Sequence, residues 1–172
     1  LGETPLHVAI RAERMENVQT IIRHIGETLN DSDRASFTNW PTVYSSRTAL
    51  HYAAHYGRSN CLHLLHSCGA SVEGRTAESD SSLTPLMIAA SRGHFDCCEW
   101  LVNAGYSIQA VDTSNRSALM HSVINGHSDV LRLLIDKRAR TTEIDTLGNT
   151  AADYARQLRW SECEALLTPQ LP

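Results

Sequence analysis

Four cysteine and histidine side chains lie close together in the middle of the sequence, and these residue types at short spacing could bind zinc. They are Cys61, His63, His66 and Cys68. In a helix, where successive residues are about 100° apart, Cys61 and Cys68 share one face and the two histidines point to another. Because four ligands on two faces cannot converge on one ion, we expect no metal site and no bound cofactor here.

The adjacent cysteines Cys97 and Cys98 could suggest redox chemistry. No cysteine, however, stands at nucleophile spacing from an obvious base, and small apolar core side chains are the better interpretation of this pair. The sequence also contains no glycine-rich phosphate loop, no GxSxG nucleophile elbow and no HExxH zinc motif. We therefore expect no catalytic residue, no small-molecule substrate and no enzyme activity within this chain.

Charge and composition narrow the classes of function further. The 172 residues include 15 basic and 19 acidic side chains, and the net charge of −4 argues against a nucleic-acid-binding protein. An odd number of cysteines without CxxC spacing indicates an intracellular location, in the cytoplasm or the nucleus. No apolar run is long enough to form a membrane segment, and no secretory signal is present. Since the first residue is Leu, we expect this chain to be a piece of a longer polypeptide. We also expect the chain to be monomeric.

The elements that must position any functional residue are copies of one short unit. Thr4-Pro5-Leu6-His7 is the first of five similar tetrapeptides, which begin at residues 4, 48, 84, 117 and 150. The last three starts are 33 residues apart. The third copy is the most complete, with Thr84-Pro85-Leu86, Ala89-Ala90, Gly93-His94, Trp100-Leu101-Val102 and Gly105. A period of this length predicts a repeat architecture of stacked supersecondary units.

Each marker in the unit has a local physical reason. Thr or Ser at the start can cap a helix, and Pro in the first turn costs no hydrogen bond. Gly57, Gly93 and Gly126 suit a left-handed turn between two antiparallel helices. The candidate core residues of the second helices are Val18, Ile21, Ile22, Cys61, Leu64, Leu65, Cys97, Trp100, Leu101, Val130, Leu133, Leu134, Cys163, Leu166 and Leu167. Because one helix pair cannot bury its own apolar face, neighbouring copies must stack.

Together these residues resemble the ankyrin repeat family, whose pattern is a TPLH start, an Ala pair, a Gly-His turn, an apolar second helix and a Gly before a hairpin. The resemblance covers nearly the whole chain. It implies an all-α fold, an ankyrin-repeat solenoid of helix–turn–helix units joined by β-hairpin loops. It further implies a single domain over residues 1–172, with repeats at about 2–46, 47–82, 83–115, 116–148 and 149–169. The first repeat carries a long hairpin insertion and the last is truncated.

Two departures from the pattern bear on stability and binding. Glu13 and Arg159 occupy positions where other copies have Gly, and each costs about 1 kcal/mol if it adopts positive φ. The first connection is much longer than the others, and residues 27–46 include Trp40 and Tyr44 among mostly polar side chains. Such long loops are usually functional or disordered. This loop could clamp a ligand, or it could fold onto the second copy and take no part in binding.

The resemblance implies that the chain binds another protein or a peptide segment. In this family the hairpins and first-helix faces form a concave groove for such partners. Carried over to this sequence, the candidate partner-binding residues are Arg11, Trp40, Tyr44, Arg47, His55, Tyr56, Arg92, Arg116 and Asn125. The recurrence of Arg47, Arg92 and Arg116 predicts an extended segment with spaced carboxylates or phosphates. Replacing these three by Ala should weaken partner capture with little effect on the melting temperature.

The sequence leaves three functions open. The first is a scaffold or adaptor module, part of a larger intracellular protein, that binds an extended and acidic peptide or loop. The second is a chromatin reader of histone tails, in which Trp40, Tyr44 and Tyr56 would surround a methylated lysine through cation–π attraction. The third is a regulatory or substrate-recruiting domain of an enzyme such as an acyltransferase, a kinase or a ubiquitin ligase.

Overall fold

The computed structural model describes residues 2–71 and 74–168 of the chain. Within these ranges it contains eleven α-helices, one short 3₁₀ helix and no strand, as expected for an all-α ankyrin-repeat solenoid. The contacts between residues divide the chain into two compact units, residues 1–85 and 86–172. The end of the last predicted repeat, at residue 169, lies outside the described residues.

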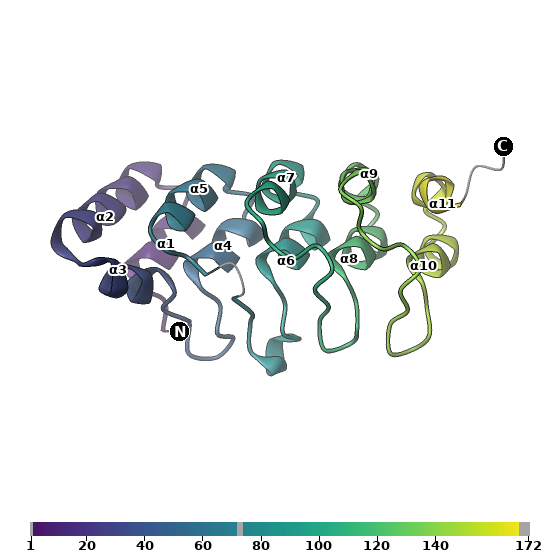
Figure 1. Cartoon of the computed structure of the whole chain (residues 1–172), viewed down its shortest axis with the longest axis horizontal. Coiled ribbons are helices and arrows are strands. Elements are labelled where there is room, and N and C mark those ends of the chain that lie inside the picture. The colour runs from purple at the N-terminus through teal and green to yellow at the C-terminus, as the bar shows by residue number, and fades with distance from the viewer. Residues whose placement is uncertain (1, 72–73, 169–172) are drawn as a thin grey trace. The chain divides into compact units, whose positions relative to one another are not determined.

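The first unit is built from two helix pairs and an inserted helix. The pairs are α1 (Pro5–Arg11) with α2 (Met15–Thr28) and α4 (Ala49–His55) with α5 (Ser59–Ser67). The insertion contains α3 (Asp31–Thr38), and the loop after α5 contains the 3₁₀ helix η1 (Glu78–Asp80). In Figure 1, α4 lies beside α1 and α5 lies beside α2, and both neighbouring pairs are in contact. Their shared core contains Leu6, Ile10, Leu50, Leu62 and Leu65, all of them fully buried.

The second unit contains three further helix pairs. They are α6 (Pro85–Arg92) with α7 (Phe95–Asn103), α8 (Ala118–Ile124) with α9 (Ser128–Asp136), and α10 (Ala151–Leu158) with α11 (Ser161–Leu167). The first helices form one layer and the second helices form another (Figure 1), with α8 packed on α10 and α9 packed on both α7 and α11. Each pair thus covers apolar surface that the next pair could not cover alone.

Polar caps begin the first helices as the sequence predicts. Thr4 donates from its hydroxyl to Nδ1 of His7 at 2.8 Å, and the buried imidazole donates from Nε2 to the carbonyl oxygen of Arg47 at 3.1 Å. Ser117 and Thr150 accept hydrogen bonds from backbone amides three residues further on. The histidine of the first start is therefore a structural residue, because it joins α1 to the loop that enters α4.

Left-handed backbone occurs at the predicted turns, and also at residues other than glycine. Glu13 and Arg159 have φ values of 57° and 59°, so both carry the strain that the sequence suggested. Gly126, with φ of 75°, is constrained twice, since a Cβ there would lie 2.9 Å from the indole ring of Trp160. Close packing between α10–α11 and the α8–α9 turn thus requires glycine at this position.

The prediction of which residues of the second helices are buried is only partly correct. The fully or largely buried members are Val18, Cys61, Leu65, Cys97, Leu101, Val130, Leu133, Leu134 and Cys163. The remaining predicted members are only half-buried: Ile21, Ile22, Leu64, Trp100, Leu166 and Leu167. Leu62, Cys98 and Leu131 are fully buried although the pattern did not select them. In α5, α7 and α9 the buried face therefore includes the residue directly after the first predicted one.

Candidate partner-binding surface

In the first unit, the carboxylate of Glu3 links α1 to α4. Arg11, exposed at the end of α1, donates from Nη1 to Oε1 of Glu3 at 3.0 Å. The same oxygen accepts a hydrogen bond of 2.8 Å from the Tyr52 hydroxyl on α4. Burial, together with the nearby carboxylate, raises the pKa of Tyr52 to about 12. Arg11 thus presents a partly neutralised guanidinium rather than an isolated charge.

Aromatic rings continue from this carboxylate along α4. The ring of Tyr52 meets His7 edge-on at 4.8 Å between centroids and lies 6.1 Å from the ring of Tyr56. Tyr56 in turn meets His55 edge-on at 4.7 Å. His55 and Tyr56 are both partly exposed at the C-terminal end of α4. The arrangement offers an apolar and hydrogen-bonding ridge, with residue types that are common at binding hot spots.

The insertion of the first repeat folds onto the second repeat. Thr38, at the end of α3, donates to the carbonyl oxygen of Cys68 at 3.3 Å. The Asn39 amide donates to the carbonyl oxygen of Gly69 at 2.8 Å and accepts from the backbone amide of Ser71 at 2.7 Å. Ala35 of α3 also packs closely on Gly69. The segment is therefore held firmly against the end of α5.

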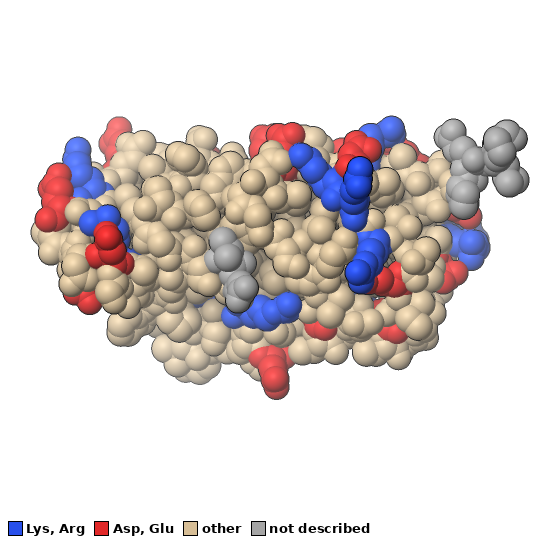
Figure 2. Space-filling model, in the orientation of Figure 1, with Lys and Arg blue, Asp and Glu red and all other residues tan. Residues whose placement is uncertain are grey.

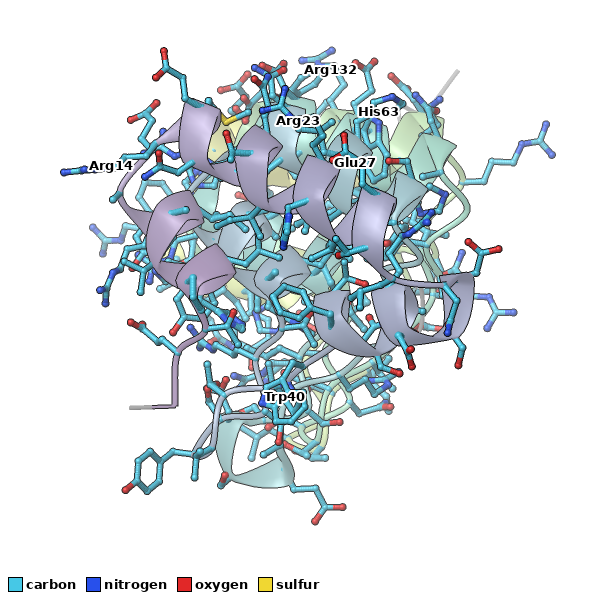
Figure 3. The ribbon with its side chains drawn as sticks, turned by 90° about the vertical axis from the view of Figure 1, so that its left-hand side faces the viewer. Arg14, Arg23, Glu27, Trp40, His63 and Arg132 are labelled. Atoms are coloured by element: carbon cyan, nitrogen blue, oxygen red, sulfur yellow. The ribbon has the colours of Figure 1, made fainter. Side chains whose placement is uncertain are left out.

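This anchoring leaves large side chains of the insertion in solvent. Trp40 is 61% exposed, Val43 is 72% exposed and Tyr44 is 77% exposed. Figure 3 shows Trp40 below α3, on the opposite side of the first unit from Arg23 and Glu27 of α2. Neither Trp40 nor Tyr44 makes a ring contact with another aromatic side chain in the part of the chain that the structure describes. Trp40, Tyr44 and Tyr56 therefore do not form a closed aromatic cage.

Arg47 is already paired within the first unit. Its Nε and Nη2 atoms contact the two carboxylate oxygens of Asp80 at 2.7 and 3.1 Å, a bidentate pair between the insertion loop and η1. Both side chains are about three-quarters buried. An ion pair of this geometry holds successive loops together and leaves little of the guanidinium for a ligand.

Arg116 has a similar place in the second unit. It donates from Nε to Asp145 at 3.3 Å and from Nη2 to the Tyr154 hydroxyl at 3.0 Å, and it lies 5.5 Å from the centroid of the same ring. Asp145 is buried and also accepts from the Tyr154 hydroxyl and from the backbone amides of Leu147 and Asn149. The hydrogen bond from Tyr154 is the largest cause that lowers the pKa of Asp145 to about 2.

Arg92 and Asn125 remain open to solvent. Both are exposed and stand at the same position of their repeats, directly after or at the end of a first helix. Arg92 has no carboxylate partner within residues 2–71 and 74–168. Asn125 donates its amide to the carbonyl oxygen of His121 at 2.9 Å, which fixes the side chain without burying it. Of the three predicted arginines, Arg92 is the one whose guanidinium is available to a partner.

The sequence analysis selected none of the loop aspartates, although a weak signal for two of them exists. Asp112 and Asp145 precede the starts Ser117 and Thr150 by the same number of residues. Asp112 accepts from backbone amides in its own loop and contacts Nε2 of His121 at 3.0 Å. Burial lowers the pKa of His121 more than Asp112 raises it. A recurring Asp before a repeat start thus marks a structural loop anchor.

The four cysteine and histidine side chains considered as zinc ligands do not converge in the described part of the chain. Cys61 and Cys68 are buried whereas His63 and His66 are exposed on α5, so the four side chains lie on different faces as helical spacing requires. No group of three or more metal-ligating side chains comes together in the described ranges. No helix there is both long and apolar enough to span a bilayer.

Comparison with known proteins agrees with the repeat architecture. The family model for ankyrin repeats in three copies matches residues 1–76, 26–112, 50–146 and 86–168. A poly [ADP-ribose] polymerase tankyrase of Caenorhabditis elegans is 33% identical over 174 residues, which cover 96% of this chain and 8% of the relative. A probable E3 ubiquitin-protein ligase, XBOS31 of Oryza sativa subsp. japonica, is 34% identical over 100 residues, 58% of this chain and 22% of the relative. Ankyrin repeat and SOCS box protein 2 of Bos taurus is 42% identical over 69 residues, 40% of this chain and 10% of the relative.

The chain therefore belongs to the ankyrin repeat family, whose members generally mediate protein–protein interaction. It spans less than a quarter of the length of each of these relatives.

Proposed function

We propose that this chain is a protein-interaction module, a scaffold or adaptor segment of a larger intracellular protein without catalytic activity of its own. It binds an extended segment or loop of a partner protein at the ends of its first helices. The observation that carries this proposal is the pattern of exposure. Tyr56, Arg92 and Asn125 occupy the same position in successive repeats and remain accessible, whereas the preceding helical turns are buried.

The chemistry of the partner follows from which side chains are free. Arg47 and Arg116 already bind Asp80 and Asp145, so they contribute to loop stability rather than to ligand charge. The Arg92 guanidinium can donate two hydrogen bonds to a carboxylate or phosphate of the partner in a bidentate geometry. The ridge of rings at the end of α4 favours an aliphatic or aromatic side chain instead. The ligand group expected in the first unit, at the end of α4, is therefore apolar, and the ligand group expected in the second unit, at the end of α6, is acidic.

The proposal is tested with Tyr56→Ala and Arg92→Ala variants of the chain. Immobilised wild type and variants are incubated with cell extract, retained proteins are identified by mass spectrometry, and the affinity of each purified candidate is then measured. A genuine partner should bind at least one variant about tenfold more weakly, as expected for a hot-spot residue. Arg23→Ala, an exposed charge on α2, is the matched control and should bind normally. If every retained protein binds all variants equally, the assignment of this surface is wrong.

A second function, recruitment of substrates to an enzyme, is favoured by the names of the relatives. They include a polymerase and a ubiquitin-protein ligase, whose chains extend far beyond the segment similar to this one. In this case the parent protein carrying Arg92→Ala would modify its specific substrate more slowly and a generic substrate at the normal rate. Equal rates on the specific substrate would exclude recruitment through Arg92. The geometry of the aromatic residues does not favour a histone reader, since Trp40, Tyr44 and Tyr56 are not in contact.

A further inference from the structure

A short basic segment follows α9 in the second unit, on an element separate from the first-helix ends. Lys137, Arg138 and Arg140 are exposed, and Ala139 between them is buried. Figure 2 shows Lys and Arg side chains gathered over the end of α9 on the face toward the viewer. We call the three exposed residues the basic segment. The net charge of the whole chain is −4, so the positive charge of the basic segment is opposite in sign to that of the chain.

The backbone of the basic segment is anchored by a side-chain amide as well as by the backbone hydrogen bonds that end α9. Gln109 donates from Nε2 to the carbonyl oxygen of Arg138 at 2.9 Å and accepts from the backbone amide of Arg140 at 3.2 Å. Lys137 donates from Nζ to Oδ1 of Asn103 at 2.8 Å. The two arginine side chains therefore extend from a fixed backbone on either side of a buried alanine. Such pre-organisation lowers the entropic cost of binding.

Arg138 occupies a backbone conformation that the other repeats assign to glycine. Its φ is 64°, and the equivalent positions of the two preceding repeats are Gly69, with φ of 84°, and Gly105, with φ of 90°. A residue with a Cβ is strained in this region, and glycine is not. Folding alone would therefore be served better by glycine. Arg138 therefore adds an exposed cation at a turn where the two preceding repeats have no side chain.

We propose that Lys137, Arg138 and Arg140 form a docking surface for a short acidic polypeptide segment. Guanidinium groups bind carboxylates in a bidentate manner, and here two of them flank a rigid turn. The partner must be short, because the carboxylates of Asp136 and Glu143 lie next to the basic segment in sequence and the chain as a whole repels polyanions. This argues for an acidic peptide rather than a nucleic acid.

An internal carboxylate already occupies part of this surface. Arg140 contacts Glu143 through Nη1 at 3.1 Å, although its side chain remains 68% exposed. Glu143 is about three-quarters buried, but the guanidinium end of Arg140 remains in solvent, so a partner carboxylate can compete for it. A Glu143→Gln variant should consequently bind an acidic peptide more tightly than the wild type does.

The proposal is tested by fluorescence anisotropy with a short labelled oligoglutamate peptide at low salt, against its oligoglutamine counterpart. The wild type should bind only the former, and added salt should weaken this binding. Arg138→Gly should weaken it about two- to fivefold, the usual range for one exposed charge pair. The triple variant K137Q/R138G/R140Q should weaken it more than about tenfold. Arg159→Gly is the matched control, since Arg159 is exposed, lies in the same unit and has φ of 59°.

Thermal unfolding separates a binding role from a structural one. If the Arg138 side chain serves binding, Arg138→Gly should unfold at or above the wild-type temperature while losing affinity. A marked decrease in melting temperature would show that the side chain is structural and would overturn the proposal. Equal loss of peptide affinity in Arg159→Gly, or a single-stranded oligonucleotide that binds more tightly than the peptide, would overturn it as well.

Discussion

Replacing Asp145 by Asn should destabilise the second unit more than its small change in shape suggests. The Asp145 carboxylate accepts from the backbone amides of Leu147 and Asn149, from the Tyr154 hydroxyl and from Nε of Arg116. An amide of the same size keeps the bonds to one oxygen. Its nitrogen would then face the Arg116 N–H, so that one buried donor would oppose another.

The expected magnitude follows from the pKa of the carboxyl group. The folded structure lowers the pKa of Asp145 from 3.8 to about 2, and one pKa unit corresponds to about 1.4 kcal/mol. The network therefore favours the ionised form by about 2 kcal/mol, and the opposed donors add to this loss. In a chain of this size, about 2 kcal/mol lowers the melting temperature by about 4–8 °C.

The dependence on pH tests the sign of the effect. Since the pKa of Asp145 is lower in the folded than in the unfolded chain, the stabilisation is fully present above about pH 4 and is lost as the pH falls toward about 2. Urea unfolding followed by circular dichroism should thus give a wild-type advantage of about 2 kcal/mol at neutral pH that shrinks across this window.

Asp136→Asn is the matched control for this experiment. It removes the same charge from an exposed position at the end of α9 and should change the free energy of unfolding by less than about 0.5 kcal/mol. The reasoning is refuted if Asp145→Asn is equally mild, or if the difference from wild type stays constant between pH 7 and pH 2.

Three further predictions concern packing, ion pairing and thiol burial. Gly126→Ala should destabilise the chain by at least about 1 kcal/mol more than Gly105→Ala in urea unfolding, because both have positive φ but only the former would press a Cβ against Trp160. Arg47→Ala should lower the melting temperature by a few degrees, since it leaves the partly buried Asp80 without its cation. The five cysteine thiols, all buried and with the pKa of three raised chiefly by burial, should react with a thiol reagent only after unfolding in urea.

Each of these has an outcome that would contradict it. Equal losses in the two glycine variants would mean that the indole contact is unimportant. An unchanged melting temperature for Arg47→Ala would support the sequence-based view of Arg47 as a free surface charge. Rapid modification of any thiol in the folded chain would show that the helix pairs open readily.

The repeat starts, the helix caps and the glycine turns were all predictable because each depends on residues close in sequence. Thr4 caps α1 through a residue three positions away, and Gly126 adopts positive φ within its own turn. The candidate surface was predictable only as a set of positions. Nothing local to Arg47 indicates Asp80, and nothing local to Arg116 indicates Tyr154, since these partners come from the following loop or helix.

The sequence by itself determined the family, the helical repeat and the approximate side of each helix that is buried, since a regular period in residue type follows directly from helical geometry. Only the tertiary structure decided which surface groups are available to a partner. Arg92 and Arg116 are the same residue type, each close to a first helix, yet one is open to solvent while the other lies between a buried carboxylate and a tyrosine ring. The physical reason is that a charged side chain can bind a partner only where it is exposed and not already paired. Its pairing depends on residues one repeat away, which come into contact with it only when the chain folds.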